Sequence, residues 1–198
     1  PQSYAVLFIQ GGATGQFAAI PLNLTQPGDT IDLLHTGQWS AKAISEAKKY
    51  GVDVRVVTDE KASNYTTTPA AGSYELNPAA KYVHYTPNET IGGVAFHYVP
   101  ETGDVPLVAD MSSMILSQPT DVTKYGLIYA GTQKNLGPAG MCVVIVRRDL
   151  MGHARPETPT FLEYSGMAAN DSMLNTPPTF GIYLLGKILK WVESKGGV

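Results

Sequence analysis

Short apolar runs alternate with amphipathic stretches along most of the chain. The apolar, β-branched runs predict seven strands, at residues 4–9, 30–34, 52–57, 82–86, 106–109, 126–130 and 141–147. Helical patterns are expected over residues 16–20, 41–50 and 177–194. This alternation predicts an α/β fold: a mostly parallel, mixed seven-stranded sheet with helices on both faces.

Two connections refine this topology. The valine-rich strand 52–57 closely follows the helix 41–50, so strand, helix and strand should form a right-handed crossover. The loop after strand 126–130 is too short for a crossover helix, so strand 141–147 should run antiparallel to its predecessor. Residues 58–80 are polar and interrupted by proline and glycine, which leaves room only for short structure.

A single lysine, Lys134, follows the strand 126–130 in a loop that contains Gly131, Gly137 and Gly140. A lysine beside small residues, just past a strand, can hold its amine in a pocket. A neutral amine in such a pocket attacks carbonyl groups to form a Schiff base, which is the chemistry that pyridoxal phosphate requires. The alternative is a solvated loop lysine, the commoner situation for this residue type.

An aspartate ends the neighbouring apolar run. Asp110 follows strand 106–109, and ligands of open α/β sheets bind outside the carboxyl ends of the strands. A carboxylate bonded to a pyridine nitrogen keeps that nitrogen protonated, so that the ring works as an electron sink. The alternative is a helix-capping or turn aspartate. A strand-end Asp110, with Lys134 after the next predicted strand, favours the cofactor interpretation.

The first strand leads into a turn of small residues, 10–15, before the first helix. Such a turn directs free backbone N–H groups and the positive end of the helix dipole at an anion, and Ala13 and Thr14 are the natural phosphate ligands. The spacing matches neither the dinucleotide fingerprint nor a P-loop. Glycines that only make a turn are the alternative.

Trp39 is expected in the loop at the carboxyl end of strand 30–34. An indole in that place could stack on a flat heteroaromatic ring, although tryptophan more often anchors a core or staples a helix. Ser40 is expected to cap the helix that follows, and Gly51 to end it.

Composition narrows the class of protein. The 198 residues suit one domain with a sizeable core. No apolar run predicts a membrane span, and a net charge of -3 without a basic cluster argues against nucleic acid. Cys142, the only cysteine, should be a buried small hydrophobe in its strand. The histidines show no metal-ligand spacing, so we expect no metal site.

Six blocks of the chain, in order, carry a shared resemblance: residues 10–21, 36–40, 82–90, 106–113, 127–140 and 170–178. Together they resemble the phosphoserine aminotransferase family, in the class V branch of pyridoxal-phosphate enzymes. The resemblance implies the aspartate-aminotransferase-like fold and pyridoxal phosphate as the cofactor. It also implies amino transfer from L-glutamate to 3-phosphohydroxypyruvate, in a cytoplasmic homodimer with a shared active site.

The same resemblance implies roles around the cofactor ring. Lys134 would be the Schiff-base lysine and Asp110 the partner of the pyridine nitrogen. Trp39 would stack on the ring, and Thr90 would lie near it.

Five residues are implied at the cofactor phosphate. Ala13, Thr14 and Gln133 would bind it within the subunit, although some members of the family carry an arginine where this chain has Thr14. Asn175 and Thr176 would reach across the dimer interface to the neighbour's phosphate. For Thr176 the alternative is the N-cap of the last helix.

The few arginines of the chain do not account for substrate binding by a complete enzyme of this family. The chain has only four: Arg55, Arg147, Arg148 and Arg155. None lies in the cofactor motifs, yet an amino-acid substrate needs bidentate carboxylate recognition. In the family the substrate-binding arginines come from segments outside residues 1–198. We therefore expect a cofactor-binding large domain, without the family's N-terminal segment and small C-terminal domain.

Two alternatives stay open. Another class V enzyme, such as a serine or alanine transaminase, would share these motifs, and the domain in isolation would be a non-catalytic module. A cysteine desulfurase is disfavoured, because its catalytic cysteine belongs on a mobile loop and Cys142 lies in a predicted strand.

Overall fold

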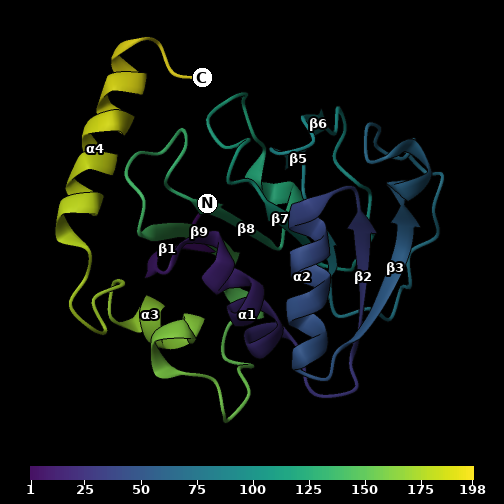
Figure 1. Cartoon of the computed structure of the whole chain (residues 1–198). Helices are drawn as coiled ribbons and strands as arrows, with labels where there is room; N and C mark the ends of the chain where they lie inside the picture. Colours follow the sequence, from purple (N-terminus) through teal and green to yellow (C-terminus); the bar gives the residue numbers. More distant parts are fainter.

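A computed structural model describes residues 1–198 as one mixed sheet with helices packed against it (Figure 1). The main sheet has seven strands in the order β1-β9-β8-β7-β4-β2-β3. Their bounds are β1 Tyr4–Gln10, β2 Thr30–His35, β3 Asp53–Asp59, β4 Val83–Tyr85, β7 Leu107–Asp110, β8 Leu127–Gly131 and β9 Met141–Arg147. Two very short strands, β5 (Asn88–Glu89) and β6 (Val94–Ala95), pair separately as a hairpin.

Six strands of the main sheet run in one direction and one strand, β9, runs against them. β3, β2, β4, β7 and β8 pair in parallel, whereas β9 runs antiparallel to both β8 and β1. This confirms the mostly parallel sheet and the reversal at the loop that carries Lys134. Every strand lies within two residues of its prediction. Most of the apolar runs form buried strands, whereas β3, at the edge of the sheet, has no buried residue.

The α-helices are α1 (Gly12–Leu24), α2 (Gln38–Lys49), α3 (Tyr164–Ala169) and α4 (Thr179–Ser194). Short 3₁₀ turns lie at Glu60–Ser63, Val122–Lys124, Arg148–Leu150 and Thr160–Leu162. Figure 1 shows α1 and α2 side by side over one face of the sheet, with α4 at one edge of the molecule. The other face is covered mainly by loop side chains, to which α4 adds Leu185.

Three helix starts differ from expectation. α1 begins four residues early because Gly11 and Gly12 take positive φ angles of 95° and 65°, which lead the chain straight into the helix. α4 begins two residues late, at Thr179. α2 begins at Gln38, so Ser40 is its third residue and not its N-cap, which is Gly37. Gly51, at φ 68°, follows the end of α2 as expected.

Two apolar clusters hold the sheet from opposite sides. One packs α1, α2 and α3 against strand residues that include Leu33, Leu127 and Val144. The other includes Leu107, Ile128 and Tyr85. Cys142 is buried in β9, as predicted, and burial raises the pKa of its thiol.

A membrane crossing would need a longer apolar helix than any that this structure contains. The His, Cys, Asp and Glu side chains nowhere gather in a group of three that could hold a metal ion. The carboxyl ends of the parallel strands meet at one edge of the sheet, which is where ligands of open α/β sheets bind.

Candidate functional site

A small cavity lies at the carboxyl edge of the parallel strands. Its lining comes from α1, from α2 and from the loops after β4, β7 and β8. The lining residues are Ala13, Trp39, Thr86, Asn88, Thr90, Asp110, Ser112, Ser113, Gln133 and Lys134. The structure thus brings together six of the nine residues that the sequence singled out.

Lys134 directs its amine into this cavity. Its Nζ donates a hydrogen bond to Thr90 Oγ1 at 2.7 Å, and it lies 5.8 Å from the centre of the Trp39 ring. The strand β8 ends three residues earlier, at Gly131, and Lys134 lies in the turn that follows it. The alternative of a freely solvated loop lysine does not describe this geometry.

Asp110 ends β7 and is only 5% exposed. Its Oδ1 accepts hydrogen bonds from the Ser112 amide at 3.1 Å and the Ser112 hydroxyl at 2.7 Å, whereas Oδ2 accepts none from the protein. Desolvation raises the pKa of the Asp110 carboxyl, against the opposing effects of these bonds and of Lys134. Asp110 is both a turn residue and a cavity residue, so the two interpretations of the sequence coexist.

Trp39 sits in the first turn of α2, not in the loop before it. One side of the cavity is formed by its indole, whose Nε1 is buried and has no hydrogen-bond partner. The hydroxyl of Thr86, another lining residue, is buried and equally unpartnered. Buried polar atoms are normally hydrogen-bonded, so these two atoms point to a polar ligand or to water in the cavity.

The phosphate candidates divide into two groups. Ala13 lines the cavity from the first turn of α1, where no side chain caps the free N–H groups, and Gln133 lines it from the loop after β8. Thr14 is exposed and does not line it. Asn175 and Thr176 are exposed and lie outside it as well. Thr176 is not the N-cap of α4, because that helix begins three residues later.

Four lining residues were not singled out from the sequence: Thr86, Asn88, Ser112 and Ser113. Ser112 connects β7 to β8, because its hydroxyl accepts a hydrogen bond from the Gly131 amide at 3.0 Å while it binds Asp110. Ser113 donates to the side-chain oxygen of Asn88 at 2.8 Å. For the two serines the available signal was position, since they lie two and three residues after the strand-end aspartate.

A histidine is buried in β4, the strand whose following loop lines the cavity. His84 Nε2 lies 2.8 Å from the Tyr129 hydroxyl, and its Nδ1 has no partner. Burial lowers the pKa of His84 to about 3, so the imidazole is neutral at pH 7 and supplies no charge to the site.

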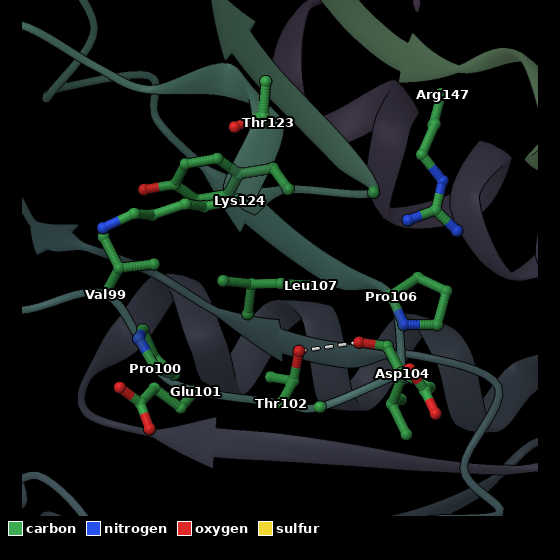
Figure 2. A pocket seen from close by; sticks show the side chains of 14 residues that line it. Val99, Pro100, Glu101, Thr102, Asp104, Pro106, Leu107, Thr123, Lys124 and Arg147 are labelled. Carbon is green, nitrogen blue, oxygen red and sulfur yellow. Dashed lines mark hydrogen bonds between the residues drawn. The ribbon is translucent and has the colours of Figure 1, made fainter. Parts of the chain in front are cut away.

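A larger hollow of about 680 Å³ lies at the opposite, amino edge of the parallel strands (Figure 2). Its walls are residues 99–107 and 123–126, together with Arg147. Figure 2 shows the hydrogen bond that Thr102 makes to the backbone oxygen of Val105, at 2.7 Å, within this wall. None of the cofactor candidates reaches it. The functional cavity is therefore identified by the side chains that line it and not by its volume.

The whole chain matches known proteins. The family model described as Aminotransferase class-V matches residues 1–198. Phosphoserine aminotransferase of Hahella chejuensis is 55% identical over all 198 residues, which span 55% of that protein. The Pseudomonas aeruginosa phosphoserine aminotransferase is 54% identical over the same residues and the same share of its length.

Solved structures also match the whole chain. A phosphoserine aminotransferase from Bacillus circulans subsp. alkalophilus has a TM-score of 0.95 and 51% identity, over all of this chain and 54% of its own. A PLP-bound phosphoserine aminotransferase from Trichomonas vaginalis has a TM-score of 0.91 and 42% identity, over all of this chain and 55% of its own. The chain spans about half the length of the relatives it matches. It belongs to the class V aminotransferase family.

Proposed function

We propose that residues 1–198 are the cofactor-binding large domain of a phosphoserine aminotransferase. The complete enzyme would use pyridoxal phosphate to move the amino group of L-glutamate to 3-phosphohydroxypyruvate. One observation carries the proposal: the Lys134 amine and the Asp110 carboxylate meet in one cavity, in a chain 55% identical to a named phosphoserine aminotransferase.

The cavity residues fit pyridoxal phosphate. The free carboxylate oxygen of Asp110 suits a protonated pyridine nitrogen, and the Trp39 indole offers a flat surface for the ring. The uncapped first turn of α1, at Ala13, suits the phosphate. When bound, pyridoxal phosphate supplies a conjugated ring that takes up the electron pair left when a proton leaves the substrate carbon.

Each residue would then have a definite task. Lys134 would hold the cofactor covalently, and its amine, once free, would carry a proton to and from the substrate carbon. Thr90 would orient that amine through the 2.7 Å hydrogen bond. Asp110 would keep its negative charge beside the pyridine nitrogen, and Trp39 would exclude water from one face of the ring.

The phosphate would be shared between two subunits. Ala13, Thr14 and Gln133 would contact it from within one subunit, and Asn175 and Thr176 from the other. Exposure of the last two side chains is compatible with such a contact. The complete protein would thus be a homodimer, and we propose that it is cytoplasmic, as the resemblance to the family implies.

Recognition of the substrate carboxylate must come from elsewhere, because none of the arginines lines the cavity. Arg55 pairs with Asp32, Arg147 pairs with Asp149, and Arg155 is buried among hydrogen bonds. We propose that segments outside residues 1–198 provide the substrate-binding arginines.

The experiment is a substrate panel with the complete protein and pyridoxal phosphate. Formation of 2-oxoglutarate from L-glutamate should depend on 3-phosphohydroxypyruvate. Pyruvate and glyoxylate are the matched acceptors, since they lack the phosphate. Equal or faster turnover with either acceptor would reject the proposed substrate and favour another class V transaminase.

A further inference from the structure

We propose that Glu89 is a positioning residue that fixes Trp39 and Thr90 on two sides of the cavity, and thereby sets the affinity for the cofactor. The inference rests on the proposed function, since it takes pyridoxal phosphate as the ligand. Glu89 itself does not line the cavity. It acts from behind the lining, through the backbone of α2 and through its own neighbour in the chain.

Glu89 belongs to β5, and its buried carboxylate lies beside the first turn of α2. It is 1% exposed and accepts three hydrogen bonds: from the Trp39 amide at 2.9 Å, the Ser40 amide at 2.9 Å and the Ser40 hydroxyl at 2.7 Å. Amides in the first turn of a helix have no partner within the helix, and a negative charge is favoured there. Glu89 therefore determines where α2 begins, and so where the Trp39 indole lies.

The fit between Glu89 and the turn before α2 is close. A Cβ atom added to Gly37 would lie 2.6 Å from Glu89 Cδ and 2.8 Å from its Cγ. The φ angle of Gly37 is 166°, an extended conformation that any residue adopts. This glycine is therefore needed for the approach of the carboxylate and not for its backbone angle.

The next residue in the chain is Thr90, whose hydroxyl accepts the hydrogen bond from Lys134. The backbone at Glu89 is held by the β5–β6 hairpin, and the Gly93 amide donates a hydrogen bond to the backbone carbonyl oxygen of Glu89 at 2.8 Å. Glu89 thus links two parts of the cavity lining: the Thr90 hydroxyl, which accepts the hydrogen bond from the Lys134 amine, and the Trp39 indole. If Glu89 shifts, both walls of the cavity move.

The first measurement is hydrogen–deuterium exchange on the cofactor-free complete protein. Glu89→Gln replaces one acceptor oxygen by an NH₂ group, so at least one of the Trp39 and Ser40 amides loses its partner. We expect at least one of these two amides to exchange about tenfold faster or more. Glu46→Gln is the matched control: it makes the same change in α2, where the carboxylate pairs with Lys49 near the far end of the helix, and it should leave both amides unchanged.

The second measurement is the dissociation constant for pyridoxal phosphate, followed by absorbance. Glu89→Gln should raise it about tenfold, because loss of aromatic stacking weakens binding to this degree. Gly37→Ala should do the same, although it keeps every polar group. The melting temperature of each cofactor-free variant shows whether the fold is intact. If Glu89→Gln fails to fold, Gly37→Ala decides by the same two measurements.

The outcomes separate the two proposals. If the unmodified protein binds no pyridoxal phosphate, the proposed function is wrong, and the exchange data still test the contact between Glu89 and α2. If the unmodified protein binds it and folded Glu89→Gln and Gly37→Ala bind equally well, the positioning role of Glu89 is wrong while the proposed function stands.

Discussion

Replacing Asp110 by asparagine should stabilise the cofactor-free protein while it damages the function. In the structure both Ser112 hydrogen bonds go to Oδ1, and the amide oxygen of asparagine can keep them. The other carboxylate oxygen has no protein partner, so the new NH₂ group displaces no bond. The variant removes a buried charge and loses no hydrogen bond.

The size of the gain follows from two opposing effects. Hydrogen bonds to a charged group are worth about 1 kcal/mol more than neutral ones, so the two Ser112 bonds together weaken by about 2 kcal/mol. Removing the charge from a group that is only 5% exposed returns several kcal/mol. We expect a net gain of about 1–2 kcal/mol, which corresponds to about 2–4 °C in melting temperature for each kcal/mol.

The gain should depend on pH. Desolvation raises the pKa of Asp110 above its ordinary value of 3.8. Between pH 3.8 and the raised pKa, the native protein therefore keeps a proton on Asp110 that the unfolded chain has already lost. Wild-type stability falls as the pH rises through this range. The variant has no such titration. Its advantage should be absent below pH 3.8 and complete above the raised pKa.

The assay is thermal unfolding of the cofactor-free protein by circular dichroism between pH 4 and pH 8. Asp104→Asn, the same change at an exposed aspartate, is the control. In the loaded enzyme, Asp110→Asn should slow proton removal from the substrate by orders of magnitude, because the ring loses its charged partner. A variant less stable than wild type at pH 7.5, or an advantage that does not change with pH, would refute the reasoning.

Three further changes test the fold and the shared site. Arg155→Met removes a buried guanidinium that donates three hydrogen bonds, and should lower the unfolding free energy by about 3 kcal/mol in urea titrations; an unchanged midpoint would contradict this. Tyr129→Phe leaves both ring nitrogens of His84 unpartnered and should cost about 1–3 kcal/mol in the same titration. Asn175→Ala should weaken cofactor affinity without lowering the melting temperature. Mixing it with Lys134→Ala protein should restore activity, and no recovery in demonstrated heterodimers would exclude the shared site.

The strands could be predicted from the sequence because each carries its own signal. Strand β9, 141–147, is apolar along nearly its whole length, and its prediction matches the structure at both ends. The reversal between β8 and β9 followed from loop length alone. The hairpin of β5 and β6 and the six-residue helix α3 were missed, because elements this short have no periodicity to detect.

The start of α2 shows the limit of local reasoning. Ser40 has the chemistry of an N-cap, yet the helix begins two residues before it, at Gln38. The acceptor for the first-turn amides is Glu89, about fifty residues away in the chain. Similarly, Lys134 and Asp110 could be found as strand-end residues, whereas Thr86 and Asn88 become cavity residues only through the packing of the loop after β4.

Chemical trapping at Lys134 tests the central claim most directly. The complete protein would be incubated with pyridoxal phosphate, reduced with borohydride and digested, and the modified peptide identified by mass spectrometry. Lys81 and Lys124 are internal controls, since both are exposed and neither lines the cavity. The account predicts one modified site, Lys134, and no stable label in Lys134→Ala protein of unchanged fold. Stoichiometric label on Lys81, Lys124 or any lysine other than Lys134 would contradict it.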